Sequence, residues 1–173
     1  PKQFINYINK PLFMHSVDKA IKSKLFKSIL IVSNNPIKNI KDKSIKVIKG
    51  GRERYQSSQK ALDFLKSKKI KNVFIHDAAR PNFSIKLLQK LNTNLRHNKA
   101  VVPFIKTENS TKYKQGKRIQ NLDRDKIIFT QTPQCFDFKT IYKLSKLNKY
   151  SVTDEASLFL NYKKNIKFIK GEK

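Results

Sequence analysis

A chain of 173 residues is long enough to bury a hydrophobic core and fits one domain, which we expect to span residues 1–173. Its 39 lysines and arginines against 12 acidic residues give a formal net charge of +27, which favours anionic ligands such as nucleotides. Because the basic residues are spread along the chain rather than gathered in one stripe, the charge alone argues against a dedicated nucleic-acid-binding protein.

The single cysteine, Cys135, excludes a disulfide framework and indicates a reducing compartment, so we expect a cytoplasmic protein. The sequence offers no obvious base for Cys135, and we interpret it as a small apolar residue rather than a nucleophile. No apolar run approaches the ~20 residues that a membrane-spanning helix requires, so we expect no membrane partner.

From residue 11 to residue 105, helix-like and strand-like patterns alternate. In the first helix, Leu12, Phe13 and Val17 lie on one face, and Pro11 suits the first turn. Short apolar runs that end in turn residues predict buried strands. In chain order we expect a helix at 11–26, strands at 28–34 and 45–51, a helix at 55–68, a strand at 72–77, a helix at 84–97 that Ser84 caps, and a strand at 99–105. This alternation predicts an α/β fold with a largely parallel sheet.

The pattern changes after residue 105. The pattern of residues 110–124 predicts two polar strands around a Gln115-Gly116 turn. Because an exposed hairpin is only marginally stable alone, we expect it to rest on another surface. The expected elements that follow are a strand that ends in "TQTPQ" (130–134), a helix at 139–147, a helix that begins near Thr153 with Thr153 or Asp154 as its cap, and a closing strand at 166–171.

Three polar patches follow predicted strands, where open α/β sheets bind ligands. The first is "GGRERYQSS" (50–58), in which glycines allow close approach to a ligand and the next helix offers amide N–H groups and the hydroxyl of Ser57 or Ser58. Taken alone, this patch is better explained as an ordinary strand-to-helix turn than as a binding site. The patch "TQTPQ" places Thr132 before a proline and is uninformative by itself.

The remaining patch, "HDAARP" (76–81), places Asp77 and Arg80 at the end of an apolar strand. Mg²⁺ commonly takes one or two protein carboxylates and completes its shell with water and phosphate oxygens, so Asp77 is a candidate metal ligand. Arg80 could then bind a phosphate in a bidentate manner. An internal Asp77–Arg80 ion pair explains the same residues without a ligand. We interpret His76 as a packed residue rather than a catalytic base.

In this order the motifs resemble those of the 2-C-methyl-D-erythritol 4-phosphate cytidylyltransferase family. The matching segments are "PKQF", "GGRERYQSS", "HDAARP", "LDR", "QTPQ" and "TDEAS", and the resemblance extends over essentially the whole chain. The resemblance implies transfer of CMP from CTP to the sugar phosphate with release of pyrophosphate, in non-mevalonate isoprenoid precursor biosynthesis, with Mg²⁺ as cofactor. It also implies a Rossmann-like nucleotidyltransferase fold, with a mostly parallel mixed sheet, helices on both faces and a β-hairpin arm at about 107–125 that reaches into the partner's site of a homodimer.

The resemblance also assigns roles to single residues. The catalytic residues would be Lys2, which neutralises the triphosphate, Asp77, which also binds the metal, and Arg124, which binds the sugar phosphate across the dimer. The nucleotide-binding residues would be Gly51, Arg52, Ser57 and Ala78, although Arg52 stands where the family often has an aspartate. The substrate-binding residues would be Arg80, Ser110, Thr132 and Thr153, with Thr107 and Thr111 as competitors of Ser110 for the hydroxyl of the arm.

Two features of the family lie outside the sequence. Its glycine-rich phosphate loop precedes "PKQ", and a further lysine follows the "KG" strand, so we expect a chain truncated at both ends. Because both features grip the triphosphate, we expect the 173-residue chain alone to be a poor catalyst. Two alternatives remain, namely a ribitol-5-phosphate cytidylyltransferase, which shares much of the motif set, and a basic nucleic-acid-binding protein.

Overall fold

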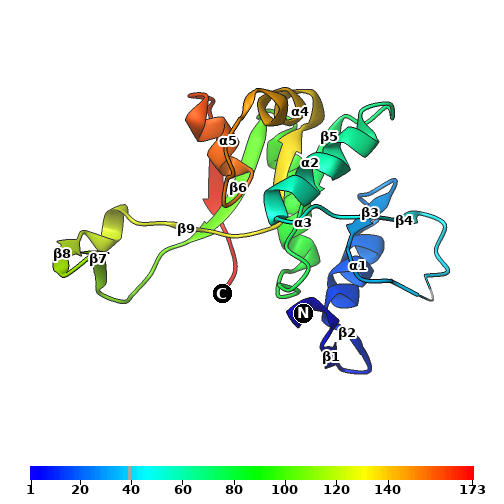
Figure 1. Cartoon of the computed structure of the whole chain (residues 1–173), viewed down its shortest axis with the longest axis horizontal. Coiled ribbons are helices and arrows are strands. Elements are labelled where there is room, and N and C mark those ends of the chain that lie inside the picture. The colour runs from blue at the N-terminus through cyan, green and yellow to red at the C-terminus, as the bar shows by residue number, and fades with distance from the viewer. Residues whose placement is uncertain (39) are drawn as a thin grey trace.

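The computed structural model describes residues 1–38 and 40–173, which form an α/β body and a hairpin that projects from it (Figure 1). The helices are α1 Leu12–Ser23, α2 Arg54–Leu65, α3 Ile85–Leu95, α4 Phe138–Leu147 and α5 Ala156–Asn161, with 3₁₀ turns η1 Lys2–Phe4 and η2 Arg124–Lys126. The strands are β1 Asn6–Tyr7, β2 Lys10–Pro11, β3 Ile29–Val32, β4 Ile45–Ile48, β5 Asn72–Ile75, β6 Ala100–Ile105, β7 Thr111–Gln115, β8 Arg118–Leu122, β9 Phe129–Thr130, β10 Gln134–Asp137 and β11 Lys167–Lys170. Every predicted helix and strand has an observed counterpart.

The main sheet has the strand order β11-β6-β10-β5, with β9 paired to the carboxyl-terminal end of β6. β11 runs parallel to β6, whereas β10 runs antiparallel to both β6 and β5. β5, β6 and β11 therefore share one direction. The sheet is mixed, as predicted, but its only parallel pairing among the described residues is β11–β6, and the pairings of β10 and β9 are antiparallel. The sequence does not predict the antiparallel β10, because its four residues stand between a Thr-Pro turn and a helix and are too few for a periodic pattern. β3 and β4 form a separate parallel ladder.

Side chains alternate across the central strands, so both faces of the sheet bury apolar residues. Ala100, Val102 and Phe136 pack against α2, α4 and α5 on one face. Val101 and Cys135 pack against the leucines of α3 on the other face. Helices therefore cover both faces, as expected for an α/β fold.

The antiparallel pairing of β10 brings two predicted patches together. Gln134 at the start of β10 pairs with Ile75 at the end of β5. The residues before β10, including Thr132, therefore lie beside the residues after β5, including Asp77.

The caps of the helices differ partly from the sequence prediction. Ser84 caps α3 as expected, since its Oγ accepts the Leu87 N–H at 3.0 Å. The last helix begins at Ala156 rather than near Thr153. Asp154 performs the capping, because its carboxylate accepts the Ser157 N–H at 3.1 Å.

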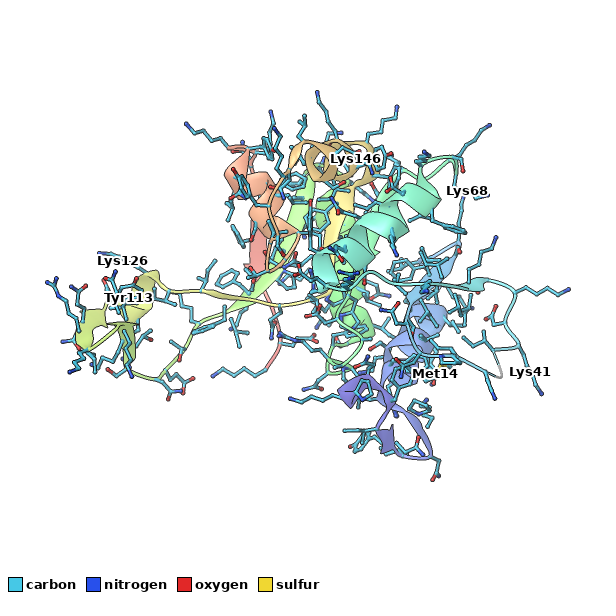
Figure 2. The ribbon with its side chains drawn as sticks, viewed as in Figure 1. Met14, Lys41, Lys68, Tyr113, Lys126 and Lys146 are labelled. Carbon is cyan, nitrogen blue, oxygen red and sulfur yellow. The ribbon has the colours of Figure 1, made fainter. Side chains whose placement is uncertain are left out.

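The predicted hairpin is present as β7 and β8, which turn at Gly116 with a φ of 60°. It projects well away from the body in Figure 1, and its side chains, including Tyr113, point into solvent in Figure 2. A second, shorter hairpin, β1–β2, turns at Ile8 and Asn9, both of which have a positive φ. In the part of the chain that the structure describes, no helix combines the length and apolar character needed to cross a membrane.

Candidate functional site

Side-chain hydrogen bonds hold the glycine loop between β4 and α2 in one shape. Ser57 Oγ accepts the Gly51 N–H at 3.0 Å, and the Asn34 side chain donates to the Gly51 carbonyl at 2.8 Å. Gln56 Oε1 accepts the Arg52 N–H at 2.8 Å and takes part in a capping box at the start of α2. The loop is therefore a preorganised surface rather than a loose turn.

A pocket of about 610 Å³ opens on this loop. Gly51, Arg52, Lys49 and Lys60 are among the residues that line it, and Lys60 Nζ also donates to the Gly50 carbonyl at 2.8 Å. Positive charge gathered around a backbone loop suits a phosphorylated ligand.

Asp77 follows β5 and meets Thr132 from the segment before β10. The Asp77 N–H donates to Thr132 Oγ1 at 3.3 Å. Asp77 Oδ2 lies 3.4 Å from Arg80 Nε, so the ion pair that could explain this patch without a ligand is present. The Arg80 side chain is 63% exposed, and an exposed pair of this kind contributes only ~0–1 kcal/mol. A phosphate could therefore displace Asp77 from Arg80 at little cost.

Arg54, the first residue of α2, is the residue that sequence reasoning missed. Its Nε donates to Asp77 Oδ1 at 2.8 Å, and its two Nη atoms donate to the two carboxylate oxygens of Glu155 at 2.9 and 2.8 Å. Burial alone would lower the pKa of Arg54, but the hydrogen bonds and charges of Glu155 and Asp77 outweigh it and raise that pKa. The available signal was its position, because a cation at a helix N-terminus opposes the helix dipole and needs an anionic partner.

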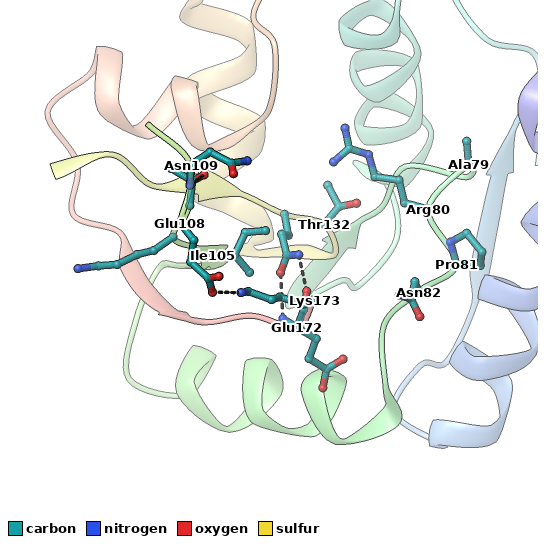
Figure 3. Close-up of a pocket in the computed structure, with 13 residues that line it drawn as sticks. Ala79, Arg80, Pro81, Asn82, Ile105, Glu108, Asn109, Thr132, Glu172 and Lys173 are labelled. Carbon is teal, nitrogen blue, oxygen red and sulfur yellow. Dashed lines mark hydrogen bonds and ion pairs between the residues drawn. The ribbon is translucent and has the colours of Figure 1, made fainter. Parts of the chain in front are cut away.

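A second pocket, of about 580 Å³, lies beside Arg80. Figure 3 shows residues 79–82 along one side, Ile105, Glu108 and Asn109 along the other, and Thr132 between them. A guanidinium group and a hydroxyl facing one pocket are suited to a phosphorylated sugar alcohol.

The carboxyl-terminal residues close this second pocket (Figure 3). The Gln131 side chain donates to the Glu172 carbonyl at 2.6 Å and accepts the Glu172 N–H at 3.1 Å. The Glu172 carboxylate accepts the Ser84 N–H at 2.7 Å, and Lys173 Nζ lies 2.5 Å from the Glu108 carboxylate. These contacts fasten the end of the sheet to α3 and to the base of the arm.

Of the three hydroxyls at the base of the arm, Thr107 lines this pocket. Its Oγ1 accepts the Asn109 N–H at 3.1 Å. Ser110 Oγ instead accepts from Lys112 Nζ at 2.9 Å, and Thr111 Oγ1 donates to the Asn109 carbonyl at 3.3 Å. Within one chain, Thr107 is thus the hydroxyl that shares a pocket with the substrate-side residues.

The predicted site residues that lie outside the linings of these two pockets are Lys2, Ser57, Asp77, Ala78, Ser110, Arg124 and Thr153. Lys2 is exposed on η1, and Thr153 is exposed before α5. Arg124 lies at the base of the arm, where its Nη1 donates to the Glu108 carbonyl at 2.6 Å. Ala78 is exposed directly after Asp77.

Two residues prove to be packed, as the sequence predicts. His76 Nε2 lies 3.1 Å from Ser16 Oγ, and its ring meets the Phe83 ring at a centroid distance of 4.7 Å. Burial lowers the pKa of His76 to about 4, so the imidazole is neutral at pH 7. Burial raises the pKa of the Cys135 thiol, which lies within the core.

The carboxylates near the site fit a metal only in company with a phosphorylated ligand. Among the described residues, no three His, Cys, Asp or Glu side chains are grouped to hold a metal ion. Asp77 has one oxygen engaged by Arg54, and the other lies near the displaceable Arg80. Mg²⁺ that arrives with a triphosphate and water needs no more than this single oxygen from the protein.

A protein-family model described as 2-C-methyl-D-erythritol 4-phosphate cytidylyltransferase matches residues 1–173. The chain belongs to this family. The resemblance carried by the short motifs is therefore confirmed over the full length of the sequence.

Individual relatives agree with the assignment. The chain is 45% identical to the bifunctional enzyme IspD/IspF of Pelagibacter ubique, over 99% of this chain and 47% of that protein. It is 32% identical to the 2-C-methyl-D-erythritol 4-phosphate cytidylyltransferase of Thermosipho melanesiensis, over 100% of this chain and 82% of that protein. The chain thus spans about half the length of the bifunctional relative.

Solved structures confirm the fold. The Francisella tularensis 2-C-methyl-D-erythritol 4-phosphate cytidylyltransferase matches with a TM-score of 0.87 and 28% identity, over 100% of this chain and 85% of that chain. The bifunctional IspDF of Campylobacter jejuni matches with a TM-score of 0.82 and 29% identity, over 99% of this chain and 44% of that chain.

Proposed function

We propose that the protein transfers the cytidylyl group of CTP to 2-C-methyl-D-erythritol 4-phosphate and releases pyrophosphate, as a step of non-mevalonate isoprenoid precursor biosynthesis. The observation that carries this proposal is the meeting of Asp77, Arg80 and Thr132 at the ends of β5 and β9, in a chain of this family. Nucleotides bind at such strand ends in open α/β sheets.

The proposed reaction needs little acid–base chemistry. The attacking phosphate oxygen of the sugar phosphate is already anionic, so in-line displacement at the α-phosphorus requires mainly positioning and charge neutralisation. In this proposal Arg80 and Thr132 bind the sugar phosphate, and Lys2 neutralises the triphosphate. His76 is packed, and its lowered pKa makes it a weak base, which is consistent with a reaction that has no need of a histidine base.

The nucleotide side of the site is the glycine loop. Gly51 and Arg52 would contact the cytosine and ribose, Ser57 would hold the loop in shape, and Ala78 would lie against the nucleotide. Mg²⁺, when bound with CTP, supplies positive charge to the phosphates, and Asp77 would hold it through Oδ2.

The exposed apolar residues of the arm are an argument for the proposed homodimer. Tyr113, Ile119 and Leu122 are exposed on a hairpin that is otherwise polar, and such apolar side chains call for a covering surface. In the proposed dimer the arm carries Arg124 and Ser110 to the partner's sugar phosphate, while Thr153 contributes from the body. A cytoplasmic location stays a prediction from the lone Cys135.

The test is a substrate comparison with the product of the complete open reading frame that contains this chain. Pyrophosphate release is measured with CTP, UTP or ATP against 2-C-methyl-D-erythritol 4-phosphate or D-ribitol 5-phosphate. We expect the highest kcat/KM with CTP and the methylerythritol phosphate. Faster turnover of the ribitol phosphate would assign the protein to the other cytidylyltransferase activity, and absence of turnover with both would contradict the proposal.

A further inference from the structure

Three elements of the fold converge on the guanidinium group of Arg54. Arg54 begins α2, directly after the glycine loop. Glu155 immediately precedes α5, and Asp77 follows His76 after the end of β5. The guanidinium group donates to both carboxylates at once, with one N–H to Asp77 and two to Glu155.

The contact with Glu155 fixes the plane of the guanidinium group. The Glu155 side chain is only 1% exposed, and a buried carboxylate requires a cationic, hydrogen-bonded partner. Two parallel N–H···O bonds in a fork geometry leave the guanidinium little freedom to rotate. The third donor, Nε, is therefore held in one direction, and Asp77 Oδ1 receives it at 2.8 Å.

This hydrogen bond differentiates the two oxygens of Asp77. The partly buried guanidinium group of Arg54 holds Oδ1. If this group moved away, the buried Glu155 carboxylate would lose its cationic partner. Oδ2 lies 3.4 Å from Nε of the 63% exposed Arg80 side chain and is the oxygen that a ligand could reach.

We infer that Arg54 is a positioning residue of the proposed reaction, which clamps on Glu155 and orients Asp77 so that one carboxylate oxygen stays available to the metal–nucleotide complex. The inference rests on the proposed function. The Arg54 side chain also connects the end of the glycine loop to Asp77, so the proposed nucleotide side and metal side of the site are held in a fixed relation.

The central test is Arg54→Lys, which keeps the positive charge but removes the planar fork. Loss of a supporting contact of this kind typically costs 10- to 100-fold, so we expect kcat/KM to fall by about that factor, mainly through kcat. The matched control is Arg96→Lys, an exposed arginine at the end of α3, and it should retain wild-type kinetics. Circular dichroism and the thermal midpoint establish that both variants fold.

A double-mutant cycle separates positioning from a merely structural role. If Arg54 acts through Asp77, Arg54→Lys in an Asp77→Asn background should slow the enzyme no further than Asp77→Asn alone. Independent, multiplicative losses would overturn the inference. So would wild-type kcat in a folded Arg54→Lys variant.

A binding measurement gives a readout besides activity. Electron paramagnetic resonance of Mn²⁺ in the presence of CTP should show about tenfold weaker Mn²⁺ binding in Arg54→Lys than in Arg96→Lys, and equal affinities would contradict the inference. If the wild-type protein shows no turnover, the proposed function fails, and this binding experiment still decides the role of Arg54.

A further variant covers the case in which Arg54→Lys does not fold. In Arg54→Met/Glu155→Met the buried carboxylate and its partly buried cationic partner are both replaced by apolar side chains of similar length, a change that is often neutral for stability. The folded double variant should show the same losses in kcat and in Mn²⁺ affinity. Retention of both properties would overturn the inference.

Discussion

At Gly51 the backbone lies so close to the first turn of α2 that an added methyl group would overlap the Cβ of Gln56. Gly51 does not have a positive φ, so packing rather than dihedral freedom requires the glycine. At Gly116, in contrast, φ is 60° and the space around an added Cβ is open. The two positions therefore require glycine for different reasons: Gly51 because of steric crowding at the candidate site, and Gly116 because of its backbone conformation in the arm.

We predict that Gly51→Ala weakens CTP binding at least tenfold, because the loop must move away from α2 to accommodate the methyl group. Gly116→Ala, which strains a turn far from the loop, should leave CTP affinity unchanged. Isothermal titration calorimetry of both variants measures the difference. Equal CTP affinities for the two variants would show that the glycine loop is not part of the nucleotide site.

Asp154 links three segments through its ionised carboxylate. It accepts the Ser157 N–H at 3.1 Å, the Gln134 side-chain N–H at 2.8 Å and the Thr130 hydroxyl at 3.0 Å. Burial raises the pKa of Asp154, but these hydrogen bonds outweigh burial and hold the pKa below its usual value of 3.8. Because the folded-state pKa lies below the unfolded-state pKa, the ionised carboxylate stabilises the fold above pH ~4, and the stabilisation is lost as the pH falls through the folded-state pKa.

Replacement of Asp154 by asparagine should therefore lower the free energy of unfolding by roughly 1 kcal/mol at pH 6, a modest value because the group is partly exposed and solvent screens its charge. The difference from wild type should narrow as the pH falls below ~4. Urea unfolding at pH 6 and pH 3 measures both quantities. If the free energies of unfolding of wild type and Asp154→Asn differ by the same amount at both pH values, the charge of Asp154 is not the source of the stabilisation.

At the scale of elements, the arm is nearly independent of the body. Within the described residues, β7 and β8 pair only with each other, and the side chains of β8 are all exposed. Deletion of these strands should therefore leave the core of the sheet intact.

We predict that replacement of residues 110–122 by a short Gly-Ser linker shifts the thermal midpoint of the monomeric fold by only a few degrees, because little apolar surface is buried there. The same replacement should convert the proposed homodimer to a monomer. Light scattering and thermal unfolding monitor the two effects. A dimer that survives the deletion would show that the arm is not the dimer contact.

Elements with a repeated pattern were predictable, and short ones were not. The helices α1, α2, α3 and α4 carry apolar faces over ten or more residues, and β5 and β6 carry apolar runs. β10 has four residues and β1 and β2 have two each, which is too short for periodicity to distinguish a strand from a turn. The positive φ at Ile8 and Asn9 is visible only in the fold, although an asparagine suits such a turn.

The candidate site was predictable only as separate patches. Asp77, Arg80 and Thr132 could be chosen from their places after strands, but their contact depends on the antiparallel β10. Arg54 was missed because its two partners, Asp77 and Glu155, lie 23 and 101 residues away in the sequence. Local patterns carry no information on pairs so distant.

At the scale of the whole molecule, positively charged residues are spread widely over the chain. Lysines such as Lys41, Lys68 and Lys126 project from widely separated parts of the surface in Figure 2. A net charge of +27 creates a positive potential that attracts anionic ligands such as the proposed phosphorylated substrates, and its basic residues are spread along the sequence rather than gathered in one segment.

We predict that kcat/KM for CTP falls roughly tenfold between about 20 and 300 mM salt, because mobile ions screen the attraction between the protein and its anionic substrates. Steady-state assays in potassium glutamate and in potassium chloride control for effects of the anion. In contrast, salt-sensitive binding to unrelated DNA duplexes with a log–log slope of several units would favour the nucleic-acid-binding alternative.

The most direct measurement is ³¹P NMR of the reaction mixture, with the complete protein, CTP, Mg²⁺ and 2-C-methyl-D-erythritol 4-phosphate. The account predicts equal amounts of pyrophosphate and a new diphosphate diester of the sugar alcohol, formed by the wild-type protein and at least 100-fold more slowly by Asp77→Asn. Release of pyrophosphate with free CMP, or an unchanged rate in Asp77→Asn, would contradict the assignment of cytidylyl transfer to the site around Asp77.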